Sequence, residues 1–347
     1  MAYTNIDKGS DYFETVTYTG TGAEQSISSL NFSPDLTWIK NRDTTDSHQL
    51  VDSVRGATKN LFSNLTNAEA TDAEGLKSFD TDGFTVGTRL GMNTSGESYV
   101  GWSWRGSDSS AVSNTDGDIT STVSVNQTSG FSIVKWNTGG QPSSTTVSIG
   151  HGLNAVPKFF IVKNLPSVED WFVYHNSLGN TKSILLNSTN AEFTNSDIWG
   201  STTPTSSVFS INTAEWGVST NDKITYCFAE KKGFSKFGSY TGNGNADGTF
   251  IYTGFKPAYV LTKRTDVSDN WVIQDNKQSP FNPTYDFLLA DSSGIPTAGG
   301  TPIDLLSNGF KVRTTSAYSN ASGGTYIYMA FAEQPLVGTN NIPATAR

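Results

Sequence analysis

The chain has 347 residues, of which 16% are charged and 12% aromatic, with a formal net charge of −9 at pH 7. This length suggests two or three domains. The acidic balance, without any cluster of Lys and Arg, excludes a basic footprint for nucleic acid. No stretch reaches the ~20 apolar residues that a bilayer span needs. We therefore expect no nucleic-acid partner and no membrane insertion.

The composition favours β-structure. A low charged fraction beside 33 glycines and abundant Ser, Thr and Asn disfavours long helices and favours short strands with tight turns. Cys227 is the only cysteine, and it lies in an apolar run. One thiol allows no internal disulfide and no thiolate metal site, so we interpret Cys227 as a buried structural residue. The first residues have no apolar region, which predicts no conventional secretion signal.

One short pattern occurs three times and organises the chain. A proline is followed by an apolar residue and then a lysine in residues 34–40, 157–163 and 257–263. Eight residues after each lysine comes a ring, which is His48, Trp171 or Trp271. Such shared spacing predicts three related units of roughly 100 residues, each large enough to bury a core of its own.

The repeat divides the chain into six regions. They are an N-terminal polar arm (1–10), β unit one (11–105), a Gly/Ser/Asn-rich linker or strand-bearing arm (106–128), β unit two (129–232), β unit three (233–336) and a C-terminal tail (337–347).

Each unit predicts the same succession of strands. An opening strand ends at a Gly-rich turn, and the Pro-to-Lys strand follows, whose proline suits a strand start. The ring begins the next strand, and a Leu/Phe-rich block comes after it, with Asn-Ala-Glu at 67–69 and 190–192. A further strand begins at Asp82-Gly83 and Asn308-Gly309, and unit two lacks this turn pair. The closing strands are apolar on both faces, which predicts a central position.

Many short strands without an amphipathic helix predict an all-β chain. We expect three tandem related β-sandwich, jelly-roll-like units.

Three residues are candidates for ligand binding. Trp199 and Trp216 lie in a unit-two loop region without repeat partners, so among the tryptophans they are the better candidates for exposed rings that stack on sugars. Core or interface packing is an equally open interpretation of both. His175 shares a repeat position with Asp52 and Asp275, where a polar side chain ends a strand otherwise built for burial. It is interpreted either as a ligand or metal contact or as a strand-end hydrogen-bonding residue.

No catalytic constellation is evident. A nucleophile elbow is missing, and Glu69 and Glu192 belong to different units, so they do not form a carboxylate pair for glycoside cleavage. Residues 80–83 and 116–118 resemble fragments of calcium loops but lack the full set of ligands, so calcium remains a hypothesis. We expect no enzyme activity, no metal site and no cofactor.

Several longer motifs carry a family resemblance. They are residues 34–42, 52–59, 67–71, 78–84, 236–244, 252–257 and 321–333. Together they make the chain, from about residue 11 to 335, resemble a repeat family of structural proteins from marine tailed bacteriophages such as cyanophages. The resemblance implies a virion component of the tail-fibre or particle-surface kind, made in the host cytoplasm, without a catalytic or metal signature.

These observations predict a bacteriophage virion structural protein on the particle surface, as a head decoration or a tail or fibre component. It would act by attachment to capsid or tail proteins and as a homo-oligomer. We expect the arm or the tail to dock onto another virion protein. The alternative is a receptor-binding spike or fibre head that recognises a host cell-surface glycan, and a weaker alternative is a polysaccharide depolymerase.

Overall fold

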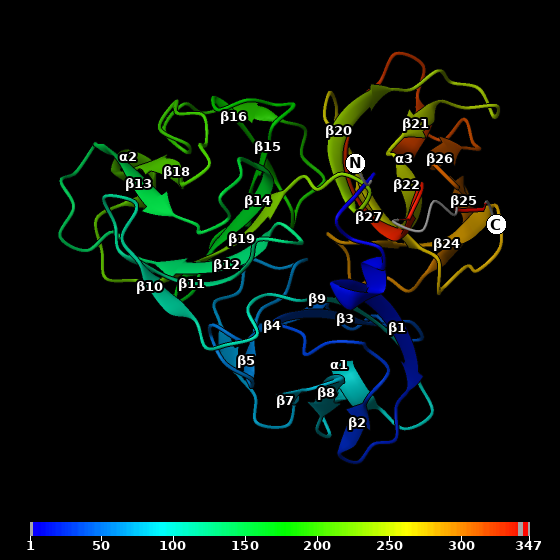
Figure 1. Ribbon diagram of the computed structural model, residues 1–347, viewed down its shortest axis with the longest axis horizontal. Helices are drawn as coiled ribbons and strands as arrows, with labels where there is room; N and C mark the ends of the chain where they lie inside the picture. The colour runs from blue at the N-terminus through cyan, green and yellow to red at the C-terminus, as the bar shows by residue number, and fades with distance from the viewer. Residues whose placement is uncertain (1–2, 339–342, 346–347) are drawn as a thin grey trace.

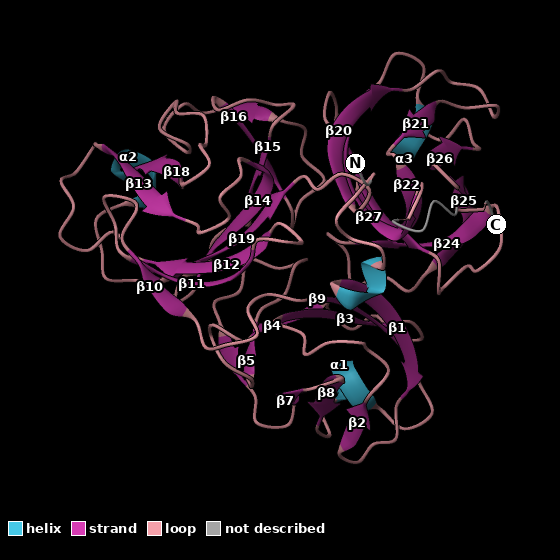
Figure 2. Ribbon diagram, viewed as in Figure 1, coloured by secondary structure: helices cyan, strands magenta, loops and turns pink. Residues whose placement is uncertain are grey.

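The computed structural model describes residues 3–338 and 343–345. Its strands form antiparallel sheets (Figure 2). Helical structure in the described residues amounts to three α-helices of four residues each and the 3-10 turn η1 (Gly9–Asp11). The prediction of an all-β chain is confirmed.

Residues 11–105, called the first segment, form two main sheets, with the strand orders β1-β9-β3-β4 and β2-β8-β7. Ile39 and Tyr99 from the first sheet and Phe84 from the second belong to one apolar cluster between them. The elements are β1 (Phe13–Thr19), β2 (Gln25–Ile27), β3 (Leu36–Asn41), β4 (Gln49–Asp52), β5 (Lys59–Asn60), β6 (Ala70–Thr71), β7 (Leu76–Asp80), β8 (Gly83–Val86), α1 (Leu90–Asn93) and β9 (Ser98–Trp104).

Residues 129–232, called the second segment, contribute to an eight-stranded sheet of order β10-β11-β12-β19-β14-β15-β16-β17 and to a two-stranded sheet, β13-β18. β10 and β11 lie in the stretch expected to be a linker or a strand-bearing arm, and β11 pairs along β12. The elements are β10 (Val112–Asn114), β11 (Ser121–Asn126), β12 (Phe131–Trp136), β13 (Thr146–Gly150), β14 (Pro157–Asn164), β15 (Phe172–His175), β16 (Lys182–Leu185), β17 (Phe193–Thr194), β18 (Val208–Asn212), α2 (Thr213–Trp216) and β19 (Lys223–Ala229).

Residues 233–336, called the third segment, form one eight-stranded sheet of order β20-β27-β22-β23-β24-β25-β26-β21. The sheet curves into a near-closed barrel, in which β22 faces β25 and β26 across the interior (Figure 1). The elements are β20 (Ser235–Thr241), β21 (Phe250–Tyr252), β22 (Phe255–Arg264), β23 (Trp271–Asp275), β24 (Thr284–Leu289), β25 (Thr297–Leu306), β26 (Gly309–Val312), α3 (Ala317–Asn320) and β27 (Thr325–Pro335).

The closing strands β9, β19 and β27 lie centrally in their sheets, as their sequences predict. Each pairs with the opening strand on one side and with the Pro-to-Lys strand on the other. Their residues are almost entirely buried, because one face of each sheet packs inside its own segment and the other packs against the neighbouring segments.

The three segments meet in one aromatic core. Three lobes surround a common centre in the view of Figure 1. At this centre the ring centroids of Trp104 and Phe228 are 6.1 Å apart, those of Trp104 and Phe331 are 5.7 Å apart, and those of Phe228 and Phe331 are 5.8 Å apart. The three rings come from the three closing strands, one from each. They form a triangle that excludes water from the centre of the molecule.

The residues expected to form a polar arm pack against the rest of the chain. Ile6 is 4% exposed and belongs to the central apolar cluster. The Thr4 hydroxyl donates to the Lys232 carbonyl oxygen at 2.7 Å, and the Tyr3 hydroxyl donates to the Gly254 carbonyl oxygen at 2.8 Å. Most of the predicted tail, 339–342 and 346–347, lies outside the described residues.

Candidate functional site

The two tryptophans that are candidates for exposed rings lie in the interior of the second segment. Trp199 is 1% and Trp216 is 7% exposed. Their indole N–H groups donate to the carbonyl oxygens of Lys182 and Ile198, at 3.0 and 2.8 Å. Both rings contact aromatic side chains of the surrounding core. Exposure of these rings is therefore wrong and core packing, the other interpretation, is confirmed, because burying large rings whose N–H groups are satisfied stabilises the fold more than displaying them.

His175 is fully buried at the boundary between the second and third segments. Its Nδ1 accepts from the Ser177 backbone N–H at 3.0 Å, so Nε2 carries the proton and donates to the Tyr328 carbonyl oxygen at 3.3 Å. Burial lowers the pKa of this imidazole to about 4. Both ring nitrogens are engaged by the chain, and the ring has no face toward solvent.

The residues that share a repeat position with His175 also contact a neighbouring segment. The Tyr226 hydroxyl of the second segment donates to Asp52 of the first at 2.8 Å. The Trp102 indole of the first segment donates to Asp275 of the third at 3.0 Å. We call the boundaries between the first and second, the second and third, and the third and first segments the first seam, the second seam and the closing seam. Asp52, His175 and Asp275, which share one repeat position, thus make one contact at the first, the second and the closing seam respectively.

The ring position makes a second contact at every seam. The Trp171 N–H donates to the Phe62 carbonyl oxygen at 2.9 Å across the first seam. Trp271 donates to the Leu185 carbonyl oxygen at 2.8 Å across the second seam. At the closing seam His48 Nε2 lies 3.0 Å from the Leu289 carbonyl oxygen, and its Nδ1 accepts from the Trp38 indole. In each case the acceptor lies in the Leu/Phe-rich block of the segment across the seam.

The three repeat lysines are buried without a carboxylate bonded to the ammonium group. Lys163 Nζ donates to the Thr66 carbonyl oxygen across the first seam at 2.8 Å, and Lys263 Nζ donates to the Thr189 carbonyl oxygen across the second at 2.9 Å. Lys40 instead bonds carbonyl oxygens of its own segment. Burial lowers the pKa of each of the three lysines to about 8.

The first seam also holds a buried charge network. The Arg55 side chain is 1% exposed, and its guanidinium binds the fully buried carboxylate of Asp52 and, at 3.2 Å, that of Glu69. It also donates to the Leu50 carbonyl oxygen. The Asp52 carboxylate raises the pKa of Arg55 against the opposing effect of burial. Arg55, Asp52 and Tyr226 satisfy one another in the interior, and Glu69 forms the partly exposed end of the network.

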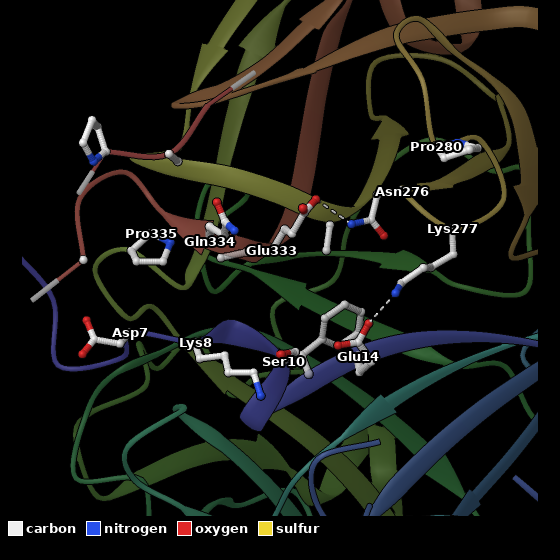
Figure 3. Close-up of a pocket in the computed structure, with 16 residues that line it drawn as sticks. Asp7, Lys8, Ser10, Glu14, Asn276, Lys277, Pro280, Glu333, Gln334 and Pro335 are labelled. Atoms are coloured by element: carbon white, nitrogen blue, oxygen red, sulfur yellow. Dashed lines mark hydrogen bonds and ion pairs between the residues drawn. The ribbon is translucent and has the colours of Figure 1, made fainter. Parts of the chain in front are cut away.

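A cleft of about 580 Å³ opens between the first and third segments (Figure 3). Its charged groups pair with one another along the walls. Lys277 contacts Glu14 at 3.1 Å, and Asn276 donates to Glu333 at 2.7 Å, while Lys256 lies 3.3 Å from the same carboxylate. The Lys277–Glu14 pair joins the two walls, and the charges of these residues are compensated within the chain.

The large aromatic side chains that are exposed in the described residues all belong to the third segment. They are Phe250, Tyr252, Phe281 and Tyr285, which we call the outer aromatic face. Strand pairing places Tyr252 beside Gly309 and Gly309 beside Leu306. The Asn282 amide bonds the backbone of Leu305 through its nitrogen and its oxygen, which fixes the neighbouring Phe281 beside β25. Sequence reasoning missed this face because aromatic residues in short strands usually point into a core.

The described residues contain no group of three His, Cys, Asp or Glu side chains arranged to hold a metal ion. Burial raises the pKa of the Cys227 thiol well above its usual value. None of the helices in the described part of the chain has the length and apolar character of a membrane span.

These features define an all-β protein whose sheets close around a shared aromatic core and are joined at three seams. The family model of a domain of unknown function, DUF7483, matches residues 8–335. The chain therefore belongs to the DUF7483 family. No curated protein and no solved structure matches it.

Proposed function

We propose that the chain consists of three tandem related β-sandwich units that together form one structural component on the surface of a bacteriophage particle. The resemblance of its motifs to particle-surface proteins of marine tailed phages is the starting point. Opening, closing and Pro-to-Lys strands occur in the same order in all three segments, which supports the relatedness of the units.

The observation that carries the proposal is the shared core. Three segments surround the triangle of Trp104, Phe228 and Phe331, and buried hydrogen bonds cross all three seams. Separating the segments would expose aromatic area, so the closed arrangement is the stable one. A compact closed block suits attachment and mechanical protection. The paired charges of the cleft give no support to catalysis, so we infer a non-enzymatic role.

Attachment would occur through surface contacts with capsid or tail proteins, and with further copies of the chain. Cryo-electron microscopy of intact particles that carry this protein tests the proposal. Density for the three-lobed block over the capsid lattice would support a decoration role, and density on the tail or a fibre would support a tail component. Mass spectrometry of purified virions gives a second test. If it does not find this protein among the components of mature particles, the virion assignment is contradicted.

Recognition of a host cell-surface glycan is a second candidate, and the outer aromatic face is the observation that favours it. Phe281 is 79% and Tyr252 is 54% exposed. Aromatic faces stack on the CH groups of sugars, and Asp304 and Lys311 offer polar groups beside the rings. The same rings serve equally as a protein contact, so binding must be measured.

Purified protein tested against capsular and lipopolysaccharide glycans by calorimetry separates these roles. Glycan binding that is lost in Tyr252→Ala and Phe281→Ala, and kept in the exposed control Leu90→Ala, would support recognition. Chain shortening of the glycan during the assay would instead indicate a depolymerase. Failure of every tested glycan to bind, together with normal incorporation into particles, would leave the structural role alone.

A further inference from the structure

The first two seams are joined by the same backbone pairs. At the first seam the Glu69 N–H donates to the Leu165 carbonyl oxygen at 2.7 Å, and the Glu169 N–H donates to the Thr66 carbonyl oxygen at 3.0 Å. At the second seam the corresponding bonds run from Glu192 to Thr265 at 2.9 Å and from Asp269 to Thr189 at 2.7 Å. Both pairs use the Asn-Ala-Glu motif, which therefore forms the joint to the next segment.

The closing seam is built differently. The third segment has no Asn-Ala-Glu motif after its Leu/Phe-rich block. Within the described residues, no backbone-to-backbone hydrogen bond joins the first segment to the third. Side chains make the connection, including the bond from the Ser63 hydroxyl to the Ala290 carbonyl oxygen at 2.8 Å and the contact of His48 with Leu289. In this part of the chain the closing seam therefore depends on side-chain packing and side-chain hydrogen bonds alone, and lacks the contribution that backbone pairs make to the other two seams.

The residues that precede the first segment add contacts at the closing seam, where the described residues form no backbone hydrogen bonds between the two segments. They leave the first segment and cross to the third, where Tyr3 bonds Gly254 and Ile6 enters the central core. Gly9 lies so close to the Ala332 carbonyl oxygen that a Cβ atom would approach it to 2.3 Å. Tyr12 packs edge-on against Phe234 with centroids 5.9 Å apart. Residues 3–10, called the strap, and the adjoining Tyr12 thus span the seam that lacks backbone joints.

We propose that the closing seam is the point where the three-segment ring opens, and that the strap holds it shut. Opening there breaks the strap and side-chain contacts, among them the packing of Trp102 and Trp104 on Tyr259. Opening at either other seam breaks backbone pairs and the bonds of a buried lysine to carbonyl oxygens across that seam. The opening exposes the faces of the first and third segments that carry Ser63 and Ala290, and leaves the interior of the second segment closed. This inference concerns the chain itself and holds whether or not the protein is a virion component.

Thiol labelling of the full-length chain tests it. Cys227 is buried inside the second segment and reports unfolding of that core. Ser63→Cys adds a buried thiol at the closing seam, and Thr265→Cys adds one at the second seam as a matched control. Each variant is labelled under native conditions with and without Ile6→Ala, which removes the apolar anchor of the strap. Tyr3→Phe, which removes the hydroxyl bonded to Gly254 of the third segment, is the milder strap variant if Ile6→Ala impairs folding.

We expect the thiol introduced at position 63 to react fastest, and Ile6→Ala to raise its rate about tenfold or more, since losing a buried Ile side chain weakens its element strongly. The thiol at position 265 and Cys227 should keep their rates. Equal acceleration at all three positions would overturn the proposal, because the strap would then stabilise the fold as a whole. An unchanged rate at position 63 in both strap variants would overturn it as well.

Discussion

Replacing Arg55 with Met tests whether the first seam is part of the protein's core. The Arg55 and Asp52 side chains are 1% and 0% exposed, and the guanidinium is the cation bound to that carboxylate. Its removal leaves a carboxylate in the interior with only the Tyr226 hydroxyl and backbone donors. Breaking a buried ion pair on one side costs about 3–5 kcal/mol. That loss corresponds to a decrease of about a hundredfold or more in the ratio of folded to unfolded protein.

Urea denaturation followed by tryptophan fluorescence measures this free energy. The matched control is Arg264→Met, which removes an ion pair with Asp266 at 2.9 Å, in which the Asp266 side chain is 35% exposed. Exposed pairs contribute only about 0–1 kcal/mol. We expect a large decrease in the midpoint for Arg55→Met and a small one for Arg264→Met.

A double variant shows whether the lost stability comes from the Asp52 carboxylate that remains buried without its cation. In Asp52→Leu combined with Arg55→Met, no buried charge of this pair remains, and apolar replacements of buried ion pairs are often neutral or stabilising. The double variant should therefore recover most of the lost stability. If Arg55→Met costs less than ~1 kcal/mol, as expected of a surface pair, the network is solvated and the reasoning about the seam is refuted.

Three further predictions follow from buried groups. Burial lowers the pKa of His48 to about 3 and of His151 and His175 to about 4 from the usual value of 6.5, so these rings stay neutral in the folded protein while the unfolded chain takes up protons. The free energy of unfolding should therefore fall as the pH drops from 6.5 towards 4, and a constant thermal midpoint between pH 6.5 and 5 would contradict this. Trp199→Ala should cost about 3–5 kcal/mol of stability, as for other buried aromatic residues, and leave any glycan binding unchanged in protein that remains folded; a loss of binding without a loss of stability would contradict the assignment of this ring to the core. Glu192→Pro removes the N–H that donates to Thr265 and should cost about 1–3 kcal/mol, whereas Glu192→Ala keeps the N–H and should cost less; equal urea midpoints for the two variants would count against the backbone joint.

The repeat spacing predicted which positions matter but not what they contact. His48, Trp171 and Trp271 share a place in the sequence, and packing or a surface position were both consistent with it. Their hydrogen-bond acceptors lie in another segment, more than 80 residues away in the chain. Spacing inside a segment carries no information about the rotation of one segment relative to the next, so these contacts were beyond sequence reasoning.

The candidate ligand residues show the same limit. Trp199 and Trp216 have no repeat partners, and that lack left exposure and core packing both open. In the fold these rings fill the interior of the second segment, beside the two-stranded sheet β13-β18. The exposed rings lie elsewhere, at Phe250 and Tyr252 on a sheet edge, where alternation with Ile251 directs them outward. Which face of a short strand is buried depends on the elements that pack against it, and only the tertiary structure shows those elements.

The sequence by itself determined the all-β class, the order of the strands and the central place of the closing strands. Those properties depend on local composition, turn residues and apolar faces, which each stretch of chain carries within itself. Only the tertiary structure decided that the outer faces of three sheets share one core, and that one of the three seams lacks backbone joints. Both depend on which surfaces of distant segments meet, because burial is a property of the pair of surfaces and not of either sequence alone.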